Sequence, residues 1–121
     1  MKYSLGIGID IENVERFKNI NKIKNRNFLH KVYTPNELEY CFSRNNFAEG
    51  FAIYFCGKEA LIKALSSLGY NDIYRHDIDI SEKMFNVFEV KLLQKPSNIK
   101  LSISLSMNES KAIAYAIAFI R

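Results

Sequence analysis

The sequence predicts an α+β domain in which helices pack on a mainly antiparallel sheet. Three observations support this class: an alternating strand pattern near the N-terminus, helical patterns between residues 12 and 68, and a run of strand patterns after residue 77. Consecutive strands with no helix between them pair antiparallel, and the helices must then cover a face of that sheet. A chain of 121 residues fits one domain, so we expect residues 1–121 to fold as a single unit.

The composition is that of an ordinary globular protein. Hydrophobic residues make up 48% and charged residues 25% of the chain, and with 5 Gly and 2 Pro this excludes disordered and collagen-like proteins. Cys41 and Cys56 show no CxxC spacing, which indicates a reducing compartment. We find no signal-peptide pattern and no stretch apolar enough to span a membrane, so we expect a cytoplasmic location. The net charge of +4 favours an anionic partner, whose class charge alone leaves open.

A strand and then a helix are predicted at the N-terminus. In residues 3–11 apolar side chains alternate with two glycines and an aspartate, which is the period of a strand. Gly6 and Gly8 leave room for a close approach to the second face of this strand. From Glu12 to about Lys24 the apolar residues recur at helical spacing and predict an amphipathic helix: Val14, Phe17, Ile20 and Ile23.

Two further helices are predicted before residue 70. The run Thr34-Pro35-Asn36-Glu37 has the signals of a helix start, because its threonine can cap the first turn and its glutamate can bond back to the threonine. This short helix should end near Ser43. A longer helix is expected over residues 47–68, with Gly69 as a left-handed cap at its end.

The second half of the chain consists of strand patterns. Residues 78–81 alternate, 85–93 are rich in strand-forming residues, and 99–105 give the clearest alternation. Residues 107–110 have the pattern of a turn, and 113–119 complete a hairpin with the preceding strand. The alternating alanines of this last segment would let a helix of the same chain or another subunit pack closely on one face.

Asp10, Glu59 and Lys63 are the first candidates for chemistry. Asp10, with Glu12 two positions on, can be a solvated acid at a strand end, and Glu59 and Lys63 can be a surface pair on one helix face. Taken together, two carboxylates from different elements and a lysine are what a Mg²⁺–phosphate site requires. The lysine would neutralise charge that develops on a transferred phosphoryl group. Spacing alone leaves open whether Asp10 and Glu59 meet.

A basic segment between Arg16 and Asn36 contains no acidic residue. A solvated helix face and a docking surface for an acidic partner explain this segment about equally well, and nucleic-acid binding is a third hypothesis. The chain shows no Gly-rich phosphate loop, zinc-ligand set or ribonucleoprotein motif, and His30 and His76 are isolated. The cations of the basic segment are Arg16, Lys18, Lys22, Lys24, Arg26 and Lys31.

Three blocks of the chain carry a resemblance to a known family. They are residues 6–17 (GIGIDIENVERF), 32–41 (VYTPNELEYC) and 55–64 (FCGKEALIKA), followed by a strand at 77–80 and a final hairpin with Ser102-Ile103-Ser104. In this order the blocks resemble the holo-(acyl-carrier-protein) synthases, the short type of 4′-phosphopantetheinyl transferase. The resemblance implies transfer of 4′-phosphopantetheine from coenzyme A to a serine of an apo acyl carrier protein, with release of 3′,5′-ADP.

The resemblance also implies roles for individual residues. Asp10 and Glu59 match the Mg²⁺ ligands of the family, and Lys63 matches its active-site lysine, so these three form the implied catalytic set. Lys58, Lys63 and Ser106 would contact coenzyme A, and Arg16 would contact the acidic carrier protein. The general base stays open between Glu59 and a metal-bound water. Members of the family form trimers with active sites between subunits, which implies a homotrimer with neither nucleic acid nor membrane as a partner.

The sequence differs from the usual pattern of the family at several positions. Tyr54 stands where the family usually has an arginine that holds a coenzyme A phosphate, Asn13 replaces an acid, and Leu105 replaces a histidine. A Ser66–Gly69 loop replaces a Gly-Thr-Gly loop, and the Gly-Lys-Pro turn between the middle strands is not evident. These differences favour, as the alternative, a non-catalytic or weakly active homologue that binds a carrier protein or partner subunit. The class of carrier protein stays open among fatty acid, polyketide and nonribosomal peptide pathways.

Overall fold

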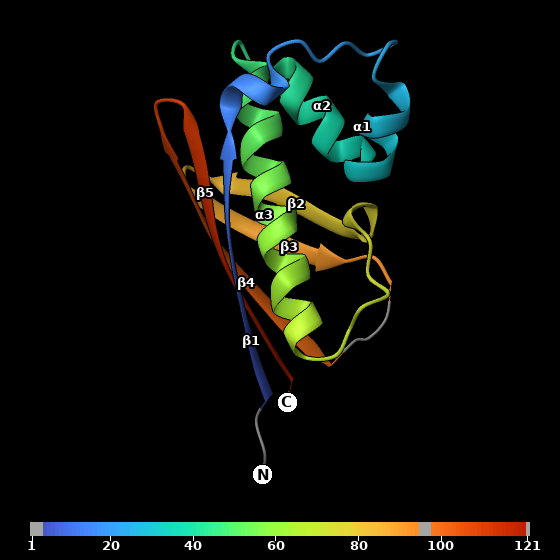
Figure 1. The fold of residues 1–121 in the computed structure, drawn as a ribbon, viewed down its shortest axis with the longest axis vertical. Helices are drawn as coiled ribbons and strands as arrows, with labels where there is room; N and C mark the ends of the chain where they lie inside the picture. The colour runs from blue at the N-terminus through green and yellow to red at the C-terminus, as the bar shows by residue number, and fades with distance from the viewer. Residues whose placement is uncertain (1–3, 95–97, 121) are drawn as a thin grey trace.

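A long helix lies along one face of a three-stranded antiparallel sheet, as Figure 1 shows for the computed structural model, which describes residues 4–94 and 98–120. The helix is α3 (Phe47–Ser67), close to the predicted 47–68, and Gly69 after it has a φ of +95° as a left-handed cap requires. The sheet has the order β1-β5-β4, and its strands are β1 (Ser4–Asn13), β5 (Lys111–Ile120) and β4 (Ile99–Asn108). The predicted α+β class is confirmed.

The contact between α3 and the sheet depends on residues with small side chains. A Cβ atom at Gly6 would lie 2.0 Å from the carbonyl oxygen of Ala64, and one at Gly8 would lie 1.9 Å from that of Ala60. The predicted close approach to β1 is therefore made by α3 of the same chain. The inward stripe of β5 is also small and fully buried, and it consists of Ala112, Ala114, Ala116 and Ala118.

The other face of the sheet is apolar and exposed. On β1 the residues that alternate with the glycines point away from α3, and Ile7, for example, is 59% exposed. The outward residues of β5 continue this face because the two strands pair directly, with Ile9 opposite Tyr115. We call this surface the outer face, and its exposed apolar residues are Leu5, Ile7, Ile9, Ile11, Tyr115 and Ile117.

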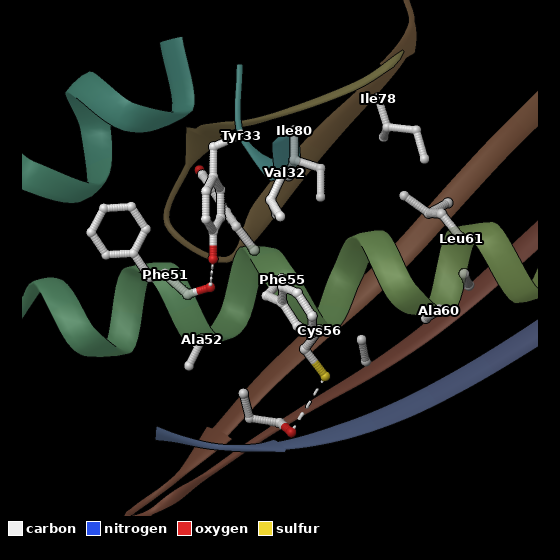
Figure 2. Close-up of a cluster of buried hydrophobic side chains, with 14 of the residues drawn as sticks. Val32, Tyr33, Phe51, Ala52, Phe55, Cys56, Ala60, Leu61, Ile78 and Ile80 are labelled. Atoms are coloured by element: carbon white, nitrogen blue, oxygen red, sulfur yellow. Dashed lines mark hydrogen bonds between the residues drawn. The ribbon is translucent and has the colours of Figure 1, made fainter. Parts of the chain in front are cut away.

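Two short helices, α1 (Arg26–Val32) and α2 (Pro35–Ser43), pack beside the N-terminal half of α3. The predicted start of α2 is confirmed, because the Thr34 hydroxyl accepts from the Glu37 N–H and the Glu37 side chain accepts from the Thr34 N–H. The core surrounds α3 and extends from these helices to β2 and to the inward face of β5. Figure 2 shows the Tyr33 hydroxyl directed at the Phe51 carbonyl oxygen, to which it donates at 2.7 Å.

The predicted helix over residues 12–24 is wrong. β1 continues to Asn13, and the chain then forms only a single 3₁₀ turn, η1 (Val14–Phe17). Pairing with β5 runs to Asn13, and the N–H of Val14 donates to the carbonyl oxygen of Ser110 at 2.9 Å, so contacts remote in the sequence keep residues 12 and 13 extended. Further on, the side chain of Asn21 accepts from two following N–H groups, which favours a turn over a helix. The short helix α1 was not predicted.

A second, two-stranded sheet completes the fold. It pairs β2 (Ile78–Met84) with β3 (Val87–Leu92) and follows a 3₁₀ turn, η2 (Arg75–Asp77). The strand predicted over 85–93 is confirmed for 87–92, whereas Phe85 and Asn86 form the turn, with φ of 61° at Asn86. The predicted β4–β5 hairpin is confirmed, although β4 extends to Asn108 and leaves a shorter turn than expected. Among the described residues, no helix is both long and apolar enough to cross a membrane.

Candidate active site

Asp10 and Lys63 meet between β1 and α3. The Nζ atom of Lys63 lies 3.1 Å from Oδ1 of Asp10 and donates to the carbonyl oxygen of Ile9 at 2.9 Å. Asp10 shares the inward face of β1 with Gly6 and Gly8, because side chains alternate along a strand. The glycines bring α3 close to the strand, so the Lys63 side chain can reach Asp10. The sequence left open whether these elements meet, and the structure places them in contact.

Glu59 lies on the same edge of α3 as Lys63. Two residues of α3 contact Asp10. The thiol of Cys56 donates to its carbonyl oxygen at 3.1 Å, and Lys63, seven residues further along the same side of the helix, contacts its side chain. Residues three and four apart are neighbours on a helix surface, so Glu59 lies between Cys56 and Lys63 on this side. Glu59 therefore shares one row of α3 with Cys56 and Lys63, and the side-chain contact it makes is with Arg75.

Glu12 is a third acid at this site that the sequence did not assign a role. It follows Asp10 on the inward face of β1, and Arg16 pairs with it at 2.9 Å. Burial, with the added effect of the neighbouring Asp10, raises the pKa of Glu12 to about 7, although Arg16 opposes this shift. The only sign of this acid in the sequence is its spacing of two from Asp10. It adds a carboxyl group, paired with Arg16, beside Asp10 on β1.

The residues at this site fit a divalent cation. The Oδ2 atom of Asp10 is buried without a hydrogen-bond partner, and a cation would satisfy such an oxygen. Mg²⁺ typically takes one or two protein carboxylates and completes its six ligands with water and phosphate oxygens. Within residues 4–94 and 98–120, no three His, Cys, Asp or Glu side chains cluster as a ready-made metal cage. The site therefore resembles an open Mg²⁺–phosphate site rather than a closed structural one.

Lys58 does not lie where the sequence analysis expected it. Its side chain is 0% exposed, and its ammonium group pairs with Glu37 at 2.7 Å and donates to the carbonyl oxygens of Arg75 and Ile78 at 2.8 and 2.5 Å. Burial lowers the pKa of Lys58 and raises that of Glu37, while each charge opposes the shift of the other. The expectation that Lys58 faces coenzyme A phosphates is corrected, because it is a core residue that ties α3 to α2 and η2.

Arg75 is a second residue that the sequence did not single out. It belongs to η2, and its Nε atom donates to Oε1 of Glu59. Its guanidinium group lies 5.5 Å from the ring centroid of Phe55, and that of Arg16 lies 4.7 Å from the same centroid. No local pattern in the sequence marks Arg75, because its contact with Glu59 depends on how the loop after α3 returns to that helix.

Ser106 and Tyr54 lie on opposite sides of β4. Ser106 is exposed, and it lines a cavity of about 420 Å³ together with Tyr40, Arg44 and Asn86. It is one residue beyond Leu105, which shares a sheet row with Asp10 through Ala114. Tyr54 is buried and stacks on Tyr40 with ring centroids 5.2 Å apart, so this position belongs to the core.

Arg16 is half-exposed beside the acidic cluster, so one part of the basic segment lies next to the site. The remainder of that segment forms two parts, the loop that follows η1 and the short helix α1. It is not the continuous helix face considered above. Lys22 in this loop lies over the ring of Phe42 at 4.8 Å from its centroid.

Comparisons with known proteins agree with this fold and site. Residues 6–118 match the sequence profile of the 4′-phosphopantetheinyl transferase superfamily. A holo-[acyl-carrier-protein] synthase of Caldicellulosiruptor saccharolyticus is 40% identical over 122 residues, covering 93% of this chain and 94% of the relative. The structure of the Helicobacter pylori holo-[acyl-carrier-protein] synthase in complex with coenzyme A is 30% identical, with a TM-score of 0.74, and the match covers 93% of this chain and 98% of that one. An apo structure from Chronobacterium ammoniagenes has a TM-score of 0.79 at 18% identity over 99% of both chains and supports the fold alone.

The fold and the carboxylate–lysine site define a 4′-phosphopantetheinyl transferase. Within that class, the chain belongs to the holo-(acyl-carrier-protein) synthase family. The resemblance found in the three sequence blocks is confirmed over nearly the whole chain.

Proposed function

We propose that this chain transfers 4′-phosphopantetheine from coenzyme A to a serine of an apo acyl carrier protein in a Mg²⁺-dependent reaction. The observation that carries the proposal is the contact of Asp10 with Lys63; Glu59, four residues before Lys63 on α3, lies on the same side of that helix by its spacing. The serine oxygen would form a bond to the β-phosphorus of coenzyme A. The bond from that phosphorus to the bridging oxygen would break, and 3′,5′-ADP would leave with the electron pair.

Asp10 and Glu59 are the residues that would hold Mg²⁺ in this reaction. When bound, the ion would offset the negative charge of the pyrophosphate oxygens. Lys63 stays in reach of this charge, because its ammonium group is anchored by Asp10 and by the Ile9 carbonyl oxygen at the exposed edge of the site. Catalysis of this kind depends on orientation and charge more than on covalent participation by the protein. Glu59 or a metal-bound water would accept the proton of the serine hydroxyl group.

The cavity beside Ser106 is our candidate for the nucleotide part of coenzyme A. Its volume of about 420 Å³ is in the range of small-molecule sites, and its wall carries one cation, Arg44, beside the acids Glu49 and Glu82. Ser106 offers a hydroxyl group at the β4 edge of the same cavity. Lys63 lies outside this cavity, next to Asp10. The pyrophosphate of coenzyme A would lie near Lys63 and the proposed metal-binding carboxylates.

Arg16 is our candidate contact for the acidic carrier protein. Its side chain is half-exposed and next to the site, so an acidic partner that docks there would bring its serine toward Asp10 and Glu59. The acid-free sequence that follows Arg16 would add long-range attraction for such a partner.

The outer face supports a homotrimer. Exposed apolar patches of this kind mark interaction sites, and β1 and β5 present one continuous row of isoleucines and a tyrosine. Ser106 lies on the same face, because it pairs with Ile113 opposite Ile11. A neighbouring subunit on the outer face would then be next to the coenzyme A cavity and complete it.

The deciding experiment measures the intact mass of an apo acyl carrier protein after incubation with this protein, coenzyme A and Mg²⁺. We expect a mass increase of one phosphopantetheine group, and we expect Asp10→Ala and Glu59→Ala to abolish it. A Lys91→Ala variant, changed on β3 away from these residues, serves as the control and should retain activity. If no carrier protein in a broad panel gains mass while binding is still detected, the non-catalytic alternative replaces the proposal.

A further inference from the structure

Arg75 makes a directional contact with one oxygen of Glu59. Its Nε atom donates to Oε1, while the recorded contacts of the described residues leave Oε2 free. The guanidinium group also rests against the Phe55 ring, 5.5 Å from the centroid. The Glu59 side chain is 20% exposed, so the contact with Arg75 is made at a largely covered carboxyl group.

The position of Arg75 is set by groups other than Glu59. Its carbonyl oxygen accepts from the buried ammonium group of Lys58 at 2.8 Å, and the same ammonium group is held by Glu37 at 2.7 Å. The following Asp77 side chain accepts from the Tyr74 N–H at 2.9 Å and closes the η2 turn around Arg75. The arginine therefore has a fixed backbone and a ring to lie against before it bonds to Glu59.

We propose that Arg75 is a positioning residue for Glu59. By holding Oε1, it fixes the carboxyl group so that Oε2 faces the divalent cation of the proposed site, and so this inference rests on the proposed function. Hydrogen-bond donors that orient a ligating carboxylate typically change metal affinity by about 10–100-fold when they are removed. Lys58 and Glu37 contribute indirectly: Lys58 bonds to the backbone carbonyl oxygen of Arg75, and Glu37 holds Lys58.

The opposite role would be competition, in which the positive charge of Arg75 blocks Glu59 from the cation. The two roles predict opposite signs. If Arg75 competes with the cation, removing its side chain tightens metal binding. If Arg75 positions Glu59, removing its side chain weakens metal binding, even though its positive charge no longer repels the cation. The contact of the guanidinium group with the Phe55 ring favours positioning, because it holds the side chain beside Glu59 by a second interaction.

The test is Mn²⁺ affinity of the protein without coenzyme A, measured by electron paramagnetic resonance of the free ion. We expect Arg75→Leu to weaken binding about 10-fold or more. Arg75→Gln should stay within about 3-fold of wild type, because its amide nitrogen is as many bonds from the backbone as the arginine Nε and can still donate to Oε1. Lys91→Leu removes a positive charge from β3 and should change nothing. Thermal unfolding of each variant, checked alongside, separates loss of the site from loss of the fold.

The outcomes distinguish this inference from the proposed function. Tighter or unchanged Mn²⁺ binding in Arg75→Leu overturns the positioning role, while the carrier-protein assay still decides the transferase activity by itself. Equal weakening in Arg75→Gln and Arg75→Leu also overturns it, because a donor at the right distance should rescue. If wild type binds no Mn²⁺ in a manner sensitive to Asp10→Ala and Glu59→Ala, the metal site of the proposed function falls, and the inference falls with it.

Discussion

Lys63 and Asp10 form an ion pair across the contact between α3 and β1, with Nζ 3.1 Å from Oδ1. The side chain of Lys63 is half-exposed, whereas that of Asp10 is 12% exposed. Nearby, carbonyl oxygens of α3 approach Gly8 and Gly6 too closely for a side chain at these positions of β1. The pair therefore lies beside a close contact of α3 with β1, and its lysine remains accessible to a ligand.

We expect Lys63→Met to lower the rate of carrier-protein modification by at least about 100-fold, the usual cost of removing one charge-stabilising donor. The Lys63 side chain is 54% exposed, so the loss of this ion pair should lower the free energy of unfolding by less than about 1 kcal/mol. Steady-state kinetics and urea unfolding on the same samples check both. A variant that is inactive because it is unfolded would contradict this prediction.

Glu12 should make the stability of the protein depend on pH. Its pKa of about 7 in the folded protein lies above its ordinary value of 4.5, so between these pH values the folded state binds more protons than the unfolded state. Stability should therefore fall as the pH rises from about 4.5 to about 7, by at most about 3 kcal/mol. Urea unfolding across this window should show the fall in wild type and a flatter profile in Glu12→Gln. Identical profiles for Glu12→Gln and wild type would contradict the assignment; Glu89→Gln, at a surface acid of β3, is the control.

Ile7 tests the role of the outer face. Its side chain is exposed, so Ile7→Asp should leave the fold of one chain intact but place a charge where the proposed trimer buries an apolar surface. Light scattering coupled to size exclusion should show a trimer for wild type and a smaller species for the variant. Ile23→Asp is the matched control, because Ile23 is 81% exposed but lies in the loop before α1. The same mass for Ile7→Asp and wild type would argue against this interface.

Lys58 and Glu37 should behave as a buried pair. Lys58→Met strands the Glu37 carboxyl group in the core, and we expect a loss of about 3–5 kcal/mol in the free energy of unfolding. Adding Glu37→Gln should recover part of this loss, because the amide carries no charge and its single oxygen still accepts from one of the two N–H groups, those of Thr34 and Ile80, that bond to the carboxylate. Urea unfolding of the two single variants and the double variant measures the coupling. A strictly additive double variant would show that the pair does not act as one unit.

Local signals predicted those parts of the fold that local chemistry determines. The capping residues of α2, the left-handed Gly69 and the alternation of β1, β4 and β5 are all encoded within a few residues. The helix expected over residues 12–24 failed because its apolar spacing competes with two other effects. These are the pairing of Val14 with the remote Ser110 and the turn that Asn21 makes with its own side chain.

The part of the candidate site that could be predicted comes from two sequence blocks, residues 6–17 and 55–64, that resemble blocks of a known family in the same order. Asp10, Glu59 and Lys63 were named in this way; the structure brings Asp10 and Lys63 into contact, and the catalytic role of all three stays a prediction. Lys58 was misplaced because a helix of mixed composition does not reveal which of its polar residues faces inward. Arg75 could not be found, because its role depends on the path of the chain between α3 and β2.

The alternation of β1 gives one strand two duties. Its even-numbered residues meet α3 and carry Asp10, while its odd-numbered residues form half of the outer face. A shift of one residue in the pairing with β5 would turn Asp10 outward and press Ile9 against α3. Insertions or deletions within these ten residues would therefore disturb the proposed active site and the proposed subunit interface together. In evolutionary terms, neither function can drift along this strand independently of the other.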